Sequence, residues 1–383
     1  MAVIQEFLKD REYRGLLRKL KPVTLRVGGK IYFGNKEYID FSSNDYLGLS
    51  NHPKLKKVAI EAIGKFGVSS CASRLSSGDA EIFHKLEDAV ARFKNKEAAL
   101  VFNSGYQANV GIISALFAKG DCIFSDRLNH ASIIDGILLS QARIFRFRHN
   151  NPEHLGLLLK KERNKFKNAL IVTESIFSMD GDRAPLKELV RLKEKYNCQI
   201  MVDEAHATGV FGKNGSGVVE EEGLSPQVDL IMGTFSKALA GFGAYLVTSK
   251  NIVDYLVNAC RSFIYSTALP PAVIACNLAS LELIKDEPDR RKILLFMAGI
   301  LRTKLIEKGF CVLGSSQIIP VILGDSLRAI EFAVKLQEKG CWVLAVRPPT
   351  VPAGEARLRF SLSYYHNEET LNKLIDAISE IRI

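Results

Sequence analysis

The sequence predicts a mixed α/β protein built around a mainly parallel sheet. From about Leu49 to Leu281, short apolar runs alternate with stretches of helical spacing, which is typical of parallel strands joined by covering helices. The chain has 383 residues, 47% hydrophobic and 25% charged, which is enough for a large and a small domain. The expected strands of the large domain are 98–102, 122–125, 169–173, 200–203, 230–233 and 244–248.

The flanking segments predict the remaining elements. Residues 1 to about 21 have helical spacing up to Pro22, which predicts an N-terminal helix lying on the body of the protein. Residues 30–40 predict a hairpin that turns at Gly34-Asn35, and the polar segment 41–48 predicts an ordered loop. Helices are expected from Pro271 to about Lys308, followed by strands at 318–323, 341–346 and 358–363. The expected domains are 1–48 (helix and hairpin), 49–281 (large) and 282–383 (small, C-terminal).

Hydropathy, cysteine content and net charge limit the classes of protein to which this chain can belong. No signal-like start and no apolar run of about eighteen residues occurs, so we expect a cytoplasmic protein without a membrane partner. The seven cysteines form no CxxC pair and are expected to be reduced, with no metal site. The net charge of +10 is spread along the chain, which favours a basic surface suited to an anionic substrate. The charge alone also allows a nucleic-acid-binding protein without enzymatic activity, although no basic arm supports a nucleic-acid partner.

A lysine stands at the end of the strand predicted at 230–233. Small residues turn the chain after this strand and lead to Lys237. A lysine whose pKa is lowered by burial or by cations becomes an imine-forming nucleophile, and pyridoxal phosphate enzymes hold their cofactor in this way. The alternative for this stretch alone is an ordinary surface lysine.

An acid and a histidine follow the strand predicted at 200–203. Asp203 is placed to keep a pyridine nitrogen protonated, and His206 is placed to hydrogen-bond a phenolic oxygen. The letters Asp-Glu-Ala-His also spell a helicase-type ATPase motif. That interpretation requires a phosphate loop of the form GxxxxGK[ST], which this sequence lacks.

Other strand ends carry polar groups that can act together with Lys237. Ser104 and Gly105 open a helix whose N-terminus can receive a phosphate, with Tyr106 beside them; the alternative is a tight turn. His130 can stack on a planar cofactor or be a structural histidine. Ser178 offers a hydroxyl in the loop 174–182, which alone reads equally well as a polar loop.

The last predicted domain offers arginines and a stiff loop. The proline-rich segment 347–354 presents Thr350, and strand alternation places Arg357 and Arg359 on one face. At least one of these arginines must meet an anion or solvent. The two open interpretations are a bidentate hold on a substrate carboxylate and a structural ion pair.

Together these segments resemble the α-oxoamine synthases, which are pyridoxal phosphate enzymes of fold type I that join an amino acid to an acyl-CoA. The resemblance runs nearly end to end, and 347–354 is most similar to members that condense L-alanine with pimeloyl-CoA in biotin synthesis. Alternatives within the family are glycine with acetyl-CoA, glycine with succinyl-CoA and serine with palmitoyl-CoA. A fold type I aminotransferase is a further alternative. The resemblance rests on the segments 41–48, 129–132, 177–182, 203–206, 234–237 and 347–354.

The resemblance implies a role for each matching residue. Lys237 is the Schiff-base lysine, His130 stacks on the ring, Asp203 pairs with the pyridine nitrogen, and His206 and Ser178 face the phenolic oxygen. Around the phosphate lie Ser104, Gly105, Tyr106 and Thr234, with Thr267 reaching it from the second subunit of a homodimer. The substrate-binding residues are Arg18, Asn44, Thr350 and Arg359, of which Arg359 holds the amino-acid carboxylate. The chain departs from the family pattern at 68–74 and at Ala240, where glycine is common.

Overall fold

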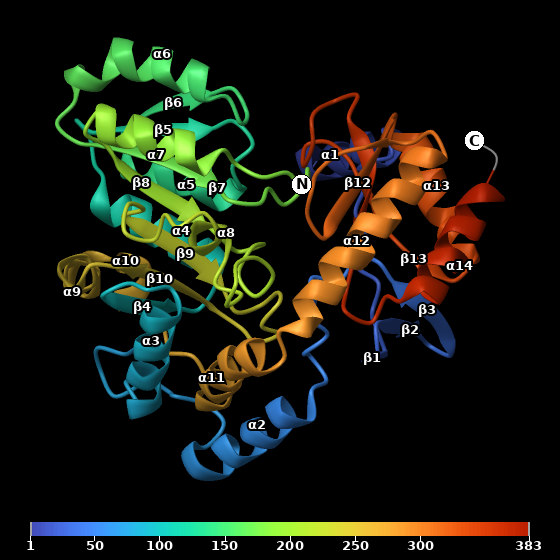
Figure 1. Ribbon diagram of the computed structural model, residues 1–383, viewed down its shortest axis with the longest axis horizontal. Coiled ribbons are helices and arrows are strands. Elements are labelled where there is room, and N and C mark those ends of the chain that lie inside the picture. Colours follow the sequence, from blue (N-terminus) through green and yellow to red (C-terminus); the bar gives the residue numbers. More distant parts are fainter. Residues whose placement is uncertain (1, 382–383) are drawn as a thin grey trace. The chain divides into compact units, whose positions relative to one another are not determined.

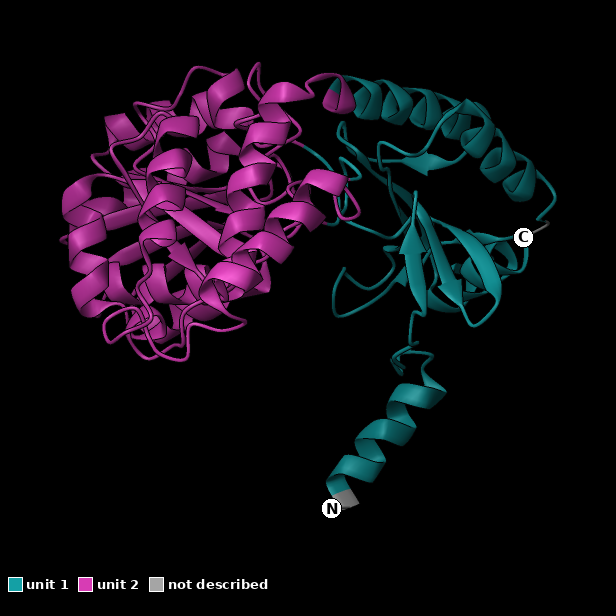
Figure 2. Cartoon of the chain, turned by 90° about the horizontal axis from the view of Figure 1, so that it is seen from below, with its two compact units in different colours: residues 1–48, 179–182, 292–383 teal, residues 49–178, 183–291 magenta. Residues whose placement is uncertain are grey.

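The computed structural model describes residues 2–381 (Figure 1). The chain consists of two compact units, which are coloured separately in Figure 2. Unit 1 comprises Met1–Gly48, Met179–Asp182 and Lys292–Ile383. Unit 2 comprises Leu49–Ser178 and Arg183–Arg291. The chain therefore passes from one unit to the other four times.

A seven-stranded sheet forms the centre of unit 2. Its order is β4-β10-β9-β8-β7-β5-β6, and β10 alone runs antiparallel to its neighbours. The predicted mainly parallel sheet is thus confirmed, including all six expected strands; the seventh, β6, was missed because Arg143 and Arg146 interrupt its apolar pattern. The strands are β4 (Ala98–Phe102), β5 (Cys122–Asp126), β6 (Arg143–Phe147), β7 (Ala169–Glu174), β8 (Gln199–Asp203), β9 (Leu230–Thr234) and β10 (Ala244–Thr248).

Helices cover this sheet and bury its apolar strands. Among them, α4 and α5 approach each other closely, because a Cβ atom added to Gly136 would lie 2.8 Å from the carbonyl oxygen of Asn109. The helices of unit 2 are α2 (Pro53–Phe66), α3 (Glu81–Phe93), α4 (Gly105–Leu116), α5 (Ala131–Ser140), α6 (Pro152–Glu162), η1 (Arg163–Lys165), α7 (Leu186–Lys195), α8 (Val218–Glu221), α9 (Lys250–Ala259), α10 (Arg261–Ile264) and α11 (Pro271–Asp286).

Unit 1 contains two four-stranded sheets. One has the order β1-β2-β3-β13 and the other β11-β12-β15-β14. The predicted hairpin is confirmed as β2 and β3, with Gly34 in the left-handed region at φ +60°. The strands are β1 (Leu25–Val27), β2 (Lys30–Phe33), β3 (Lys36–Asp40), β11 (Cys311–Val312), β12 (Ile318–Gly324), β13 (Cys341–Trp342), β14 (Ala345–Val346) and β15 (Ala356–Ser361).

Two predictions for unit 1 are wrong. The single strand expected at 341–346 is divided, because β13 pairs with β3 whereas β14 pairs with β15 in the other sheet. The N-terminal helix α1 (Ala2–Tyr13) ends well before Pro22, since Gly15 adopts φ +64° and the amide of Leu16 turns back to the Arg11 carbonyl. Its apolar residues Val3 and Phe7 are exposed. The other helices are α12 (Asp289–Glu307), α13 (Ser326–Glu338) and α14 (Glu368–Ser379).

Two further features concern the cysteines and the hydropathy of the helices. All seven cysteines are free thiols, and four of them are buried. Within residues 2–381, none of the helices combines the length and hydropathy that crossing a membrane requires.

Candidate active site

The lysine and histidine singled out from the sequence are in direct contact in unit 2. Lys237 lies in the turn after β9, and its Nζ is 2.9 Å from Nε2 of His206, which is buried beyond the end of β8. An amine and an imidazole at this distance can share a proton. The two side chains are therefore a hydrogen-bonded pair at the carboxyl ends of adjacent strands.

Asp203 is the last residue of β8 and is buried. Its Oδ1 accepts the backbone N–H of Ala205 at 2.8 Å, and its Oδ2 accepts Nδ2 of Asn109 at 3.0 Å. A carboxylate can only accept hydrogen bonds, and here each of its oxygens has an N–H donor. Asn109 was not singled out from the sequence, because a polar residue within a helical pattern ordinarily faces solvent.

A second buried acid stands beside Asp203. Glu174 ends β7 and is the register partner of Asp203 on β8. Burial raises the pKa of Glu174 well above its usual range, and Asp203 raises it further, whereas Lys237 acts in the opposite direction. Its Oε1 accepts the backbone N–H of His130 at 2.7 Å. An acid that directly ends an apolar run was the sequence signal for this residue, but the sequence did not assign it a role.

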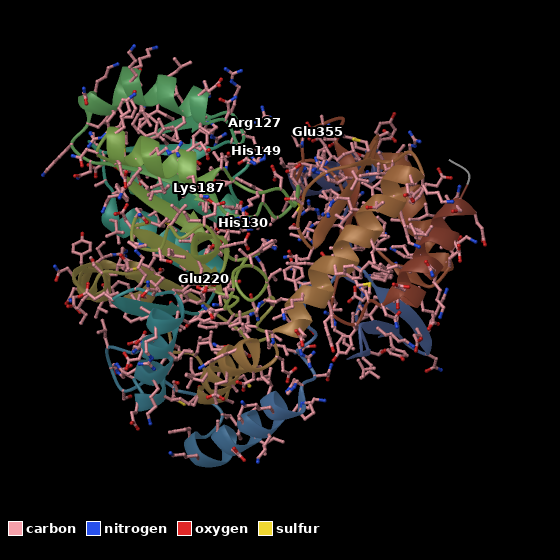
Figure 3. All side chains as sticks on the ribbon, viewed as in Figure 1. Arg127, His130, His149, Lys187, Glu220 and Glu355 are labelled. Carbon is pink, nitrogen blue, oxygen red and sulfur yellow. The ribbon has the colours of Figure 1, made fainter. Side chains whose placement is uncertain are left out.

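His130 is the N-cap of α5 and is labelled in Figure 3. Its Nδ1 lies 2.8 Å from Oγ of Ser132 and accepts the Ser132 backbone N–H at 3.3 Å. Desolvation of the imidazole lowers the pKa of His130; Asp203 raises it and Lys237 lowers it further. The residue as a whole is exposed, although the hydrogen bonds of its backbone and ring are partly buried.

The start of α4 packs closely against the end of β9. Ser104 caps the helix by accepting the Gln107 N–H at 3.1 Å. A Cβ atom on Gly105 would lie 2.8 Å from Cγ2 of Thr234, so only glycine allows this approach. Thr234 is 5% exposed, and within the described part of the chain its Oγ1 has no hydrogen-bond partner. A buried hydroxyl of this kind, beside a helix N-terminus, suits a phosphate oxygen.

Two other residues predicted for the cofactor, Tyr106 and Thr267, also lie near the start of α4. Tyr106 is exposed, and its hydroxyl donates to Asp135. This hydrogen bond raises the pKa of Tyr106, with desolvation acting in the same direction. Thr267 is also exposed, and its carbonyl oxygen accepts Nδ2 of Asn103 at 2.8 Å.

The loop that carries Ser178 has an unusual path. Ile176 and Arg183 pair across its base in unit 2, whereas residues 179–182 at its tip belong to unit 1. Within unit 1, Oδ1 of Asp180 accepts Nη1 of Arg357 at 2.6 Å. Because Arg357 is fully buried, it takes the structural ion pair that was one of the two interpretations for the paired arginines.

The predicted substrate residues all lie in unit 1, where they form two groups. In one group, Nη2 of Arg18 donates to Oγ1 of Thr350 at 2.8 Å. In the other, the hydroxyl of Tyr46 donates to Asn44 at 3.0 Å and accepts Nη2 of Arg359 at 3.5 Å. Burial raises the pKa of Tyr46, while Arg359 lowers it. Tyr46 was missed in the sequence because it reads as part of the loop 41–48.

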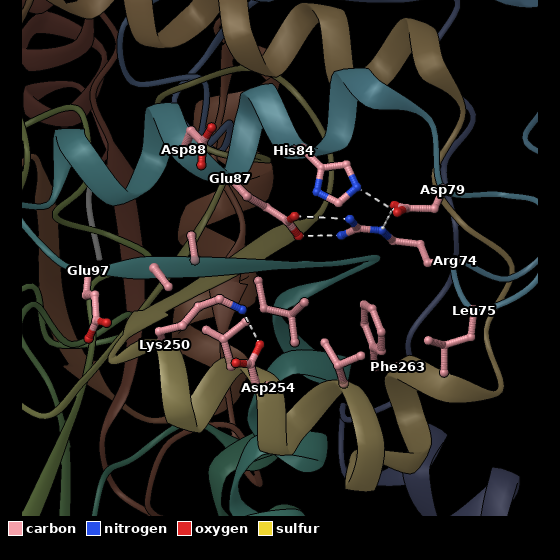
Figure 4. Close-up of a pocket in the computed structure, with 15 residues that line it drawn as sticks. Arg74, Leu75, Asp79, His84, Glu87, Asp88, Glu97, Lys250, Asp254 and Phe263 are labelled. Atoms are coloured by element: carbon pink, nitrogen blue, oxygen red, sulfur yellow. Dashed lines mark hydrogen bonds and ion pairs between the residues drawn. The ribbon is translucent and has the colours of Figure 1, made fainter.

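Unit 2 also contains a cavity of about 420 Å³ (Figure 4). Arg74 is one of the residues that line it, and its guanidinium donates hydrogen bonds to both Asp79 and Glu87. None of the residues predicted for cofactor or substrate lines this cavity. Its remaining lining residues include His84, Glu97, Lys250, Asp254 and Phe263.

Comparison with known proteins gives matches along nearly the whole chain. The family model of class I and II aminotransferases matches residues 36–378. The 8-amino-7-oxononanoate synthase of Geobacter sulfurreducens is 48% identical over 98% of this chain and 96% of its own length. That of Geotalea daltonii is 46% identical over 100% of this chain and 98% of its own.

Solved structures share the same fold. Serine palmitoyltransferase of Sphingomonas wittichii superimposes with a TM-score of 0.92 at 33% identity, covering 98% of this chain and 95% of its own. The 8-amino-7-oxononanoate synthase of Francisella tularensis gives 0.78 at 33% identity, covering 90% and 97%. The chain therefore belongs to the class I and II aminotransferase family and, within it, to the α-oxoamine synthases of fold type I.

Proposed function

We propose that the protein condenses L-alanine with pimeloyl-CoA, or another pimeloyl thioester, to give 8-amino-7-oxononanoate, CoA and carbon dioxide. This reaction is a step of biotin biosynthesis and makes the protein a pyridoxal phosphate-dependent acyltransferase. The observation that carries the proposal is the contact of Lys237 with His206 beside the buried Asp203. Curated relatives at 42–48% identity with the name of this synthase support the substrate pair.

The residues of unit 2 fit the cofactor. The partnerless Oγ1 of Thr234, the close approach at Gly105 and the capped start of α4 together suit a phosphate. Asp203 would face the pyridine nitrogen and His130 the ring. Ser178 and His206 would contact the phenolic oxygen, and Lys237 would anchor the cofactor. When bound, pyridoxal phosphate supplies the electron sink that stabilises a carbanion at the α-carbon of an amino acid.

The chain's own groups then position the substrate and move the proton. Nζ of Lys237 takes the α-proton of alanine, and His206 at 2.9 Å keeps that amine oriented. Arg359 holds the alanine carboxylate so that the α C–H bond, rather than the bond to the carboxylate, is aligned for cleavage. The α-carbon bonds to the thioester carbonyl and the CoA thiolate leaves. The carboxylate then departs as carbon dioxide, and a proton replaces it. Arg18, Asn44 and Thr350 would contact the substrates.

We further propose a cytoplasmic homodimer with shared active sites. Thr267 would reach the phosphate from the second subunit, which its exposed position allows. Seven unpaired cysteines are typical of a reducing compartment. Mixing inactive Lys237→Ala and Thr267→Ala chains tests the shared site: hybrid dimers should regain part of the CoA release, whereas independent sites would show no gain.

The central experiment measures CoA release by the purified, cofactor-loaded protein. L-alanine with pimeloyl-CoA is compared with glycine plus acetyl-CoA, glycine plus succinyl-CoA and serine plus palmitoyl-CoA. We expect release with the first pair and its loss, by at least about 1,000-fold, in Lys237→Ala. Lys187→Ala, which changes an exposed lysine of α7, is the matched control and should keep the original rate.

Each other outcome points to a defined alternative. Preferential release with serine and palmitoyl-CoA would assign the activity of the serine palmitoyltransferase with the similar fold. Conversion of the cofactor to its amine form by an amino acid alone would indicate an aminotransferase. A Lys237→Ala variant with near-normal turnover would refute the lysine's role.

A further inference from the structure

We propose that Asn109 is a positioning residue that joins Asp203 and His130 through one chain of hydrogen bonds and fixes the His130 imidazole as the tautomer with its proton on Nε2. The inference rests on the proposed function, in which Asp203 and His130 both face the cofactor. It adds Asn109 and Ser132, neither of which touches the cofactor in that scheme.

The chain of bonds begins at the Asn109 amide. This residue is 1% exposed and lies in the second turn of α4. Its Nδ2 carries two hydrogens, and the two acceptors within reach are Oδ2 of Asp203 and Oγ of Ser132, each at 3.0 Å. The reverse orientation of the amide would place two acceptor oxygens against each other at Asp203. The carboxylate therefore determines which way the amide points.

The hydrogen bond from Asn109 then determines which atom donates to the imidazole. Because Ser132 Oγ accepts from Asn109, its single hydrogen is available for Nδ1 of His130 at 2.8 Å. The Ser132 backbone N–H, at 3.3 Å, also points to Nδ1. Two donors on Nδ1 leave the ring proton on Nε2 and keep the ring neutral. Desolvation, which lowers the pKa of His130, also favours the neutral ring.

The backbone sets the length of this chain of bonds. Gly136 of α5 allows the helix to approach α4 so closely that an added Cβ would lie 2.8 Å from the Asn109 carbonyl oxygen and 3.1 Å from Cα of Val110. At this separation, the short side chains of Asn109 and Ser132 meet directly. Ser132 is fully buried and Asn109 is 1% exposed, so both partners are shielded from bulk water.

The test reads the imidazole directly, in the cofactor-free protein. With ¹⁵N-labelled histidine, the nitrogen resonances of His130 are assigned by their loss in His130→Gln and followed through a pH titration. We expect the Nε2–H tautomer in the unmodified chain. Ser132→Ala and Asn109→Leu should each shift the tautomer ratio towards Nδ1–H by about five-fold, as expected for one lost neutral hydrogen bond. Ser140→Ala, a buried serine of the same helix that bonds only to neighbouring backbone, is the control and should change nothing.

A second measurement separates the two branches of the chain of bonds. Asn109→Leu also removes a donor from Asp203, so the dissociation constant of pyridoxal phosphate should rise about ten-fold. Ser132→Ala leaves that donor in place and should change the constant less than two-fold. A Ser132→Ala protein with the tautomer ratio of Ser140→Ala would overturn the proposal, as would Asn109→Leu with unchanged cofactor affinity. Absence of CoA release would count against the proposed function and leave the tautomer result standing.

Discussion

Replacing Arg357 with methionine removes the buried cation of unit 1 and should destabilise that unit strongly. The guanidinium is fully buried, and it donates to Asp180 at 2.6 Å, to Glu355 at 2.9 Å and to the Glu355 carbonyl at 3.0 Å. Methionine approximates its length but provides no donor. Asp180 then keeps a largely buried carboxylate without its cation.

The expected cost follows from the exposure of each partner. The Glu355 side chain is 47% exposed, so its pair contributes less than about 1 kcal/mol. The Asp180 side chain is 15% exposed, and removing one member of such a pair typically costs about 3–5 kcal/mol. We expect a loss of about 3 kcal/mol, since Asp180 retains some contact with water. Asp180→Asn keeps an acceptor oxygen and leaves Arg357 paired with Glu355, so it should cost about 1–2 kcal/mol.

The single tryptophan makes the assay specific to unit 1. Trp342 lies in β13, is 7% exposed and packs 4.3 Å from the ring of Phe33. Its fluorescence during urea titration therefore reports unfolding of unit 1 rather than of the whole chain. In the double variant, Arg357→Met with Asp180→Asn, the cost should be smaller than the sum of the single costs.

Two results would refute this reasoning. If Arg357→Met lowered the free energy of unfolding of unit 1 by less than about 1 kcal/mol, the buried pair would not be a main support of this unit. If the costs of the two substitutions were additive, Arg357 and Asp180 would not act as a pair.

Two further predictions concern backbone strain and pH. Ala240 adopts φ +52°, which costs an L-residue about 1–2 kcal/mol, so Ala240→Gly should raise the thermal unfolding midpoint although glycine is more flexible when unfolded; a lower midpoint would contradict the strain. Burial lowers the pKa of His366 to about 4, below its ordinary 6.5, so its contribution is fully present above pH 6.5 and is lost as pH falls towards 4. Unit 1 should lose up to about 3 kcal/mol over that range by Trp342 fluorescence. His366→Leu should flatten the profile, and an unchanged slope would exclude His366 as its source.

The strands of unit 2 were predictable because their apolar runs are short, uninterrupted and bounded by helical patterns. The same local signal failed at β6, where two arginines break the run, and at 341–346, where one apparent strand supplies two sheets. The positions of the acid, histidine and lysine were predictable because Asp203 directly ends an apolar run, and His206 and Lys237 follow such runs within a few residues.

What the sequence could not supply depends on partners distant in the chain. Alternation placed Arg357 and Arg359 on one face, but only the fold shows that Asp180, 177 residues away, pairs with Arg357. Asn109 reads as an ordinary helical residue until α5 buries it, and the close packing at Gly136 that permits this burial has no local signature.

The four passages of the chain between the units have a consequence for synthesis on the ribosome. Asp180 leaves the ribosome long before Arg357. Nearly half of the chain must still be synthesised before the loop tip 179–182 can form its ion pair with Arg357. Unit 2 ends at Arg291 and can be complete while unit 1 still lacks its C-terminal segment. For the same reason, no single cut in the gene yields either unit whole. A truncated product that stops at Arg291 would carry the loop tip without the strand that receives it.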